Sequence, residues 1–105
     1  MAFGIFSPSR VDEFARSLAQ SVVRRYPPAI ANNPDQGVSQ NRITEILDQA
    51  FAGAHEFREK NKLGLFGRAK LGNTFKWELR EFGYEEKFVD FATGKLSDRL
   101  ARSPV

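Results

Sequence analysis

The chain has 105 residues, a formal net charge of +3, ten phenylalanines and no cysteine. This length suits a single domain, 1–105, with its own hydrophobic core, and the missing cysteine excludes disulfides, thiolate metal sites and thiol nucleophiles. No stretch reaches the roughly 20 apolar residues that cross a bilayer, and the apolar run 1–6 is too short for a signal peptide, so we expect a soluble, cytoplasmic protein.

The first helix is predicted over residues 8–26. One apolar stripe runs along it at helical spacing and consists of Val11, Phe14, Ala15, Leu18, Ala19, Val22 and Tyr26. Ser7 is expected to cap its start, with Phe6 packing on Val11 across the cap. The prolines at 27–28 cannot continue the pattern, so they end the helix.

A connector over 27–38 follows, rich in the turn formers asparagine, proline and glycine. It is expected to be an exposed loop that either crosses between helices or carries a binding site. The second helix is predicted over 39–61, with Ser39 as its cap and Ile43 packing against Val38. Its apolar stripe continues as far as Phe57.

Residues 63–72 contain three glycines among leucines and a phenylalanine, which predicts an ordered loop with at most one helical turn. A third helix is predicted over 73–82 and a fourth over 85–101. Gly83 joins them, because helices commonly close on a left-handed residue that glycine adopts without cost. Lys95 and Arg99 fall on the apolar stripe of the fourth helix, so its last turns are expected to pack loosely.

These elements predict an all-α fold: a compact bundle of about four helices with an aromatic, Phe-rich core. The sequence does not predict an enzyme. His55 is the only histidine and has no partner at a useful spacing, the carboxylate pairs lie on polar faces, and the glycines at 64, 67 and 72 match no phosphate-binding motif. We therefore predict no catalytic residue, no cofactor and no metal site.

A basic segment is the first candidate binding feature. Residues 60–77 contain no acid and five basic residues, Lys60, Lys62, Arg68, Lys70 and Lys76. Joined with Arg24 and Arg25, they would form a basic stripe for sequence-independent binding to nucleic-acid phosphates, with Phe66 and Trp77 available to stack on bases. Pairing with neighbouring acidic side chains would argue against this alternative.

A second candidate surface surrounds the hinge between the third and fourth helices. Trp77 lies off the apolar stripe of its helix and next to Arg80, a combination typical of interface anchors. Together with Gly83 and Tyr84 at the hinge, these residues are the candidate partner-binding set. They favour a protein-binding or adaptor module whose partner is another protein.

The hinge also carries a family resemblance. The string Leu79-x-x-Phe82-Gly83-Tyr84, followed by Val89-x-x-Ala92, resembles the first helix–loop–helix of ubiquitin-associated domains. In that family an apolar residue, a glycine and an aromatic residue mark the loop that contacts the partner, so the resemblance implies protein binding at this hinge. Those domains pack a third helix after the hairpin, for which only residues 95–105 remain here.

Overall fold

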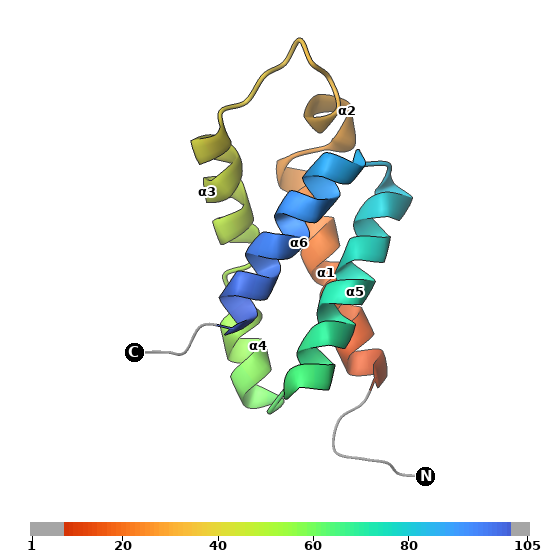
Figure 1. The fold of residues 1–105 in the computed structure, drawn as a ribbon, viewed down its shortest axis with the longest axis vertical. Helices are drawn as coiled ribbons and strands as arrows, with labels where there is room; N and C mark the ends of the chain where they lie inside the picture. The colour runs from red at the N-terminus through yellow and green to blue at the C-terminus, as the bar shows by residue number, and fades with distance from the viewer. Residues whose placement is uncertain (1–7, 102–105) are drawn as a thin grey trace.

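The computed structural model describes residues 8–101, and within this range the chain is helical and contains no strand. The helical segments are α1 (Pro8–Arg25), α2 (Pro28–Ala31), α3 (Gln40–Ala50), α4 (Ala54–Lys60), α5 (Leu65–Phe82) and α6 (Glu86–Ala101). In Figure 1, α1 and α5 run upward along the long axis of the molecule, and α6 and the pair α3 and α4 run downward. This confirms the predicted all-α bundle. The predicted cap at Ser7 and the packing of Phe6 lie outside the described residues.

The core lies where the apolar stripes of these helices meet. Its most buried side chains include Val11, Ala15, Leu18 and Val22 of α1, Leu71, Phe75 and Leu79 of α5, and Val89, Ala92, Leu96 and Leu100 of α6. Phe51 and Phe75 meet edge to face, with 5.4 Å between ring centroids, a geometry that the ring quadrupoles favour. Phe14 and Phe57 stack at the margin, 4.0 Å apart. The aromatic, Phe-rich core is therefore confirmed.

The predicted second helix is wrong as one continuous element, because a turn at 51–53 divides it into α3 and α4. Its start is confirmed, since the Ser39 hydroxyl accepts a hydrogen bond from the Arg42 backbone N–H at 3.1 Å. Phe51, the first residue of the turn, and Ala54, which follows it, are both buried. Gly53 has a low helix propensity, which favours a break at this position, and the bend keeps Phe51 and Ala54 in the core.

The loop predicted over 63–72 is also wrong, because α5 begins at Leu65 and includes Gly67 and Gly72. Each interior glycine costs about 1 kcal/mol relative to alanine. Both glycines are buried, and the packing of α5 between two other helices outweighs that cost. The turn before α5 closes α4 with Lys62 in the left-handed region at φ 51°. The Leu63 N–H bonds to the Arg58 carbonyl at 3.0 Å, which is the pattern of a Schellman motif.

The hinge at Gly83 is confirmed. Its φ of 99° lies in the left-handed region, and its N–H bonds to the Arg80 carbonyl at the end of α5. The next N–H, from Tyr84, reaches the Leu79 carbonyl at 3.3 Å. These two bonds again form a Schellman motif, so α5 ends because glycine permits a conformation that a side chain with Cβ resists.

The last turns of α6 pack tightly, and the expectation of loose packing is wrong. Leu96 and Leu100 are fully buried. The cations at the edge of the stripe extend away from the core instead: Lys95 Nζ lies 5.4 Å from the centroid of the Phe91 ring, and Arg99 binds Asp48 of α3 at 3.0 Å. Long basic side chains can cover apolar surface while their charges remain in water.

The connector between α1 and α3 holds the short helix α2 and docks on the α5–α6 hinge. Asn32 makes the attachment on both sides: its side-chain amide donates to the Gly83 carbonyl at 2.8 Å, and its side-chain oxygen accepts from the Glu85 N–H at 3.1 Å. Only the part of the connector after Asn33 is an extended loop, which arches from α2 to α3 (Figure 1).

Candidate functional site

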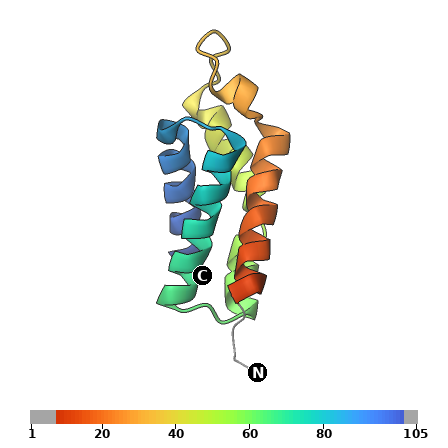
Figure 2. The same ribbon diagram turned by 90° about the vertical axis from the view of Figure 1, so that its right-hand side faces the viewer.

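The outer side of α5 is a helix face that no other helix covers. Figure 2 shows α5 in front, with α6 on one side and α1 on the other. Asn73, Lys76, Trp77 and Arg80 share this outer side because they are three or four residues apart. Trp77 is 54% exposed, an unusual position for the largest apolar side chain of the molecule. We call these four residues the Trp77 face.

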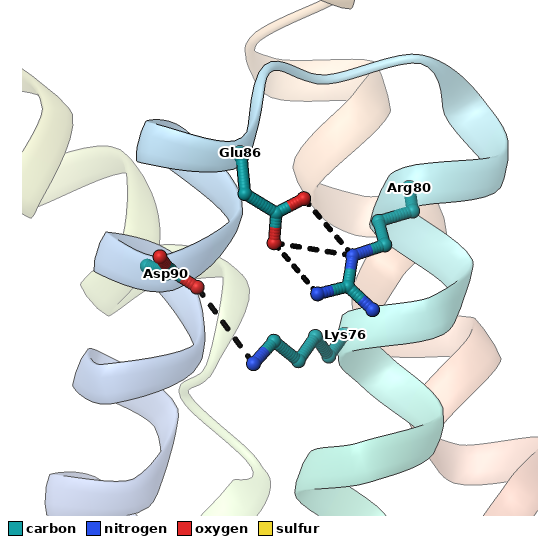
Figure 3. Close-up of polar contacts among 4 residues, drawn as sticks. All are labelled: Lys76, Arg80, Glu86 and Asp90. Atoms are coloured by element: carbon teal, nitrogen blue, oxygen red, sulfur yellow. Dashed lines mark hydrogen bonds and ion pairs between the residues drawn. The ribbon is translucent and has the colours of Figure 1, made fainter.

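Arg80 is fixed within the Trp77 face by its ion pair with Glu86, drawn in Figure 3, and by a contact with the Trp77 ring. Its Nη2 lies 2.6 Å and its Nε 3.2 Å from Oε2 of Glu86 on α6, and its Nε also lies 3.0 Å from Oε1. Its guanidinium carbon lies 5.5 Å from the Trp77 ring centroid, within cation–π range. The hydrogen bonds from Arg80 hold the pKa of the Glu86 carboxyl below its ordinary value. The face therefore presents Trp77 beside a charged group whose orientation is already set.

The predicted partner-binding residues separate into two pairs. Trp77 and Arg80 lie together, as expected. Tyr84 is only 5% exposed and points into the core, where its hydroxyl donates to the Tyr26 carbonyl at 2.6 Å. Gly83 closes α5, and its carbonyl is occupied by Asn32. The hinge that resembles the ubiquitin-associated loop is thus covered by the connector, and Tyr84 offers no surface to a partner.

The predicted basic patch does not form a single surface. Lys70 Nζ lies 3.8 Å from Asp12 of α1, and Lys76 Nζ lies 3.7 Å from Asp90 of α6 (Figure 3). Arg24 and Arg25 end α1 at the opposite end of the bundle from the start of α5 (Figure 1). An 18-residue helix is about 27 Å long, so these arginines do not continue a stripe with Lys60, Lys62 and Arg68.

Leu65 was missed as a site residue in the sequence, and Phe66 was named only for stacking on nucleic-acid bases. Leu65 is 70% exposed and Phe66 is 87% exposed, at the end of the bundle where α4 turns into α5. Because residues 63–72 were predicted as a loop, no helix face was assigned to either side chain. Extending the wheel of α5 back by two turns would have placed Phe66 on the side of Trp77, away from Leu71 and Phe75.

A shallow groove of about 320 Å³ lies at the other end of the bundle, between the connector and α6. Its lining residues are Tyr26, Ala31, Gln40, Ile43, Glu85, Lys87, Phe88 and Phe91. The walls are mostly apolar, and one carboxylate and one ammonium group stand at its rim. This chemistry suits contact with an apolar side chain.

The one histidine of the chain, His55, lies in the first turn of α4. His55 Nε2 lies 4.0 Å from the Glu59 carboxylate one turn away, and no hydrogen bond is made by this buried nitrogen. Over residues 8–101, no three histidine or carboxylate side chains gather as metal ligands would.

Comparison of the chain with protein-family models, with curated proteins and with solved structures finds no match.

Proposed function

We propose that this protein is a non-enzymatic protein-binding or adaptor module, and that the Trp77 face is its contact surface. The observation that carries the proposal is the exposure of Trp77 on an uncovered helix face, next to an oriented Arg80. Tryptophan and arginine are the residues most enriched among those that dominate binding energy at protein interfaces.

The geometry lowers the entropic cost of binding at this face. An immobilised, rotamer-rich side chain costs about 0.5–1.5 kcal/mol when a partner orders it. Arg80 is already held by Glu86 and by the Trp77 ring, and Lys76 by Asp90. A partner that covers Trp77 therefore meets a surface with most of its polar side chains in place.

The nucleic-acid alternative has less support. Two of the five basic residues pair with carboxylates of neighbouring helices, and the arginines that end α1 lie at the far end of the bundle. The remaining three, Lys60, Lys62 and Arg68, gather at one end of the bundle, whereas sequence-independent binding needs several cations along one extended phosphate path.

The proposal is tested by photo-crosslinking from the centre of the face. A photoreactive amino acid replaces Asn73, and the protein is irradiated in cells of its source. We expect one protein adduct, lost on Trp77→Ala and retained on Phe82→Ala. Phe82 is a matched control, since it is an exposed aromatic residue of the same helix that lies about 140° away around the axis. A nuclease-sensitive adduct, or equal yields from both variants, would contradict the proposal.

A further inference from the structure

We propose that the end of the bundle formed by the α4–α5 turn docks on an anionic membrane surface. We call this end the tip and define it by Leu65 and Phe66 with the cations Lys60, Lys62 and Arg68. The proposal does not depend on the function assigned to the Trp77 face, because the two surfaces share no residue.

The tip holds two large apolar side chains in water. Leu65 and Phe66 are consecutive residues in the first turn of α5 and are 70% and 87% exposed. The turn before them is defined by its own contacts: Leu63 is buried, and the hydrogen bonds that close α4 set the backbone on either side of Lys62. Side chains exposed to this extent project from the surface, as insertion between lipid headgroups requires.

The charges around this projection are positive. Lys60 and Lys62 are exposed and make no ion pair within residues 8–101, and Arg68 Nε turns back to the Gly64 carbonyl at 3.4 Å. Arg10, at the start of α1, joins the same end through a 3.0 Å hydrogen bond to Asn61.

Among the described residues, no acid forms an ion pair with Lys60, Lys62 or Arg68. Glu59 of α4 lies 3.8 Å from Arg58 and 4.0 Å from His55. Glu56 and the Asp98 of α6 are exposed on the sides of their helices. No acid occurs in the chain between Lys60 and Trp77.

This combination fits an anionic lipid surface better than the other occupants. An aliphatic residue beside a single phenylalanine offers poor stacking to nucleic-acid bases. A leucine and a phenylalanine surrounded by lysine and arginine match the apolar and charged layers of a headgroup region.

Such docking is peripheral, since none of the helices within residues 8–101 is long and apolar enough to cross a bilayer. Trp77 follows Phe66 by eleven residues along α5, which corresponds to about 16 Å of helix. The Trp77 face would therefore remain above the headgroups and open to a protein partner.

The test is sedimentation of the full chain with vesicles of phosphatidylcholine alone or mixed with phosphatidylserine, at physiological salt. We expect binding to the anionic vesicles only. Leu65→Ser with Phe66→Ser should weaken it at least tenfold, and so should Lys60→Glu with Lys62→Glu, because each cation near such a surface contributes about a fivefold change in affinity. Circular dichroism should show that each variant keeps its helical content, as expected for exposed positions.

Two matched controls distinguish an effect of the tip from an effect of the net charge of the protein and from an effect of the Trp77 face. Arg24→Glu with Arg25→Glu makes the same charge change at the opposite end of the bundle and should leave vesicle binding within about twofold, because both side chains are far from the tip. Trp77→Ser should also leave it unchanged. A Phe66→Trp, Trp77→Phe protein should show blue-shifted emission on anionic vesicles.

The following results would overturn the proposal: no vesicle binding by the full chain, equal binding to neutral and anionic vesicles, or a loss caused by Trp77→Ser and not by the Leu65 and Phe66 changes. A protein adduct from a photoreactive group at Ala69, without vesicle binding, would assign the tip to a protein partner instead.

Discussion

The hydrogen bond from Tyr84 to the Tyr26 carbonyl fastens the α5–α6 hinge to the end of α1, and its removal tests the fold directly. The bond is 2.6 Å long and buried, and it joins residues far apart in the sequence. Tyr84→Phe keeps the ring, which lies 4.8 Å from the Phe88 centroid, and deletes only the donor. A buried acceptor left without a partner costs about 1–3 kcal/mol, so we expect a loss of about 1–2 kcal/mol.

Urea unfolding followed by the helical circular dichroism signal measures this loss. The transition midpoint should fall while the m-value stays constant, because the exposed surface does not change. For a domain near this size the melting temperature should fall by roughly 5–15 °C.

Tyr26→Phe is the matched control. Tyr26 is the other tyrosine of the chain, and its hydroxyl makes no hydrogen bond within the described residues and is not a buried unpaired group. Its loss should stay within about 0.5 kcal/mol. Equal losses in the two variants, or none in Tyr84→Phe, would refute the role assigned to this bond.

Three further predictions concern the same hinge and its surroundings. Burial raises the pKa of the Tyr84 phenol above its ordinary value of 10.0. The stabilisation from the protonated phenol is therefore complete below pH 10 and declines as the pH rises toward the folded-state pKa. Above about pH 10, the urea midpoint should fall less steeply with pH in Tyr84→Phe than in the wild type, because phenylalanine does not titrate. Gly83→Ala should lower stability by about 1 kcal/mol because the φ of Gly83 is positive. Gly94→Ala lies inside α6 with nothing within 4 Å of the new Cβ, and it should raise stability by about 0.5–1 kcal/mol. Thermal unfolding measures both changes, and stability changes of the same sign in the two variants would contradict this interpretation. Asn32→Ala should expose the hinge without unfolding the bundle, seen as faster hydrogen exchange at the Glu85 amide, and unchanged exchange there would mean that Asn32 does not hold it.

The sequence predicted the elements whose apolar side chains all point inward. The stripe of α1 from Val11 to Val22 is buried except at Phe14, which is partly buried, and a single-sided helix of this kind is recognisable from spacing alone. Gly83 was also predictable, because glycine after an apolar stripe is a strong stop signal. The Ser39 cap belongs to the same class of local, short-range signals.

The break at 51–53 was hidden because the apolar spacing continues through it. Phe51 and Ala54 are three residues apart, so the stripe reads as one helix even though the backbone turns between them. Gly53 was a local signal for the break, whereas the packing of Phe51 against Phe75 is a long-range contact that the spacing does not reveal. Tyr84 was misplaced for a similar reason, because its hydroxyl partner is contributed by the end of α1.

The sequence pattern did not predict a helix at Leu65 and Phe66, and the reason supports the functional proposals. Trp77, Leu65 and Phe66 are hydrophobic side chains on sides of the helix that face water, so the apolar residues of α5 do not form one stripe. A hydrophobic residue that weakens the pattern of its own helix, and stays exposed in a packed bundle, contributes little to folding. Conflicts between local pattern and fold tend to mark functional or strained positions. On α5 they occur in two places, the tip and the Trp77 face, about 16 Å apart along a rigid helix. A helix that is buried on one side and apolar at two separate places on the other suits a module that binds two surfaces at once.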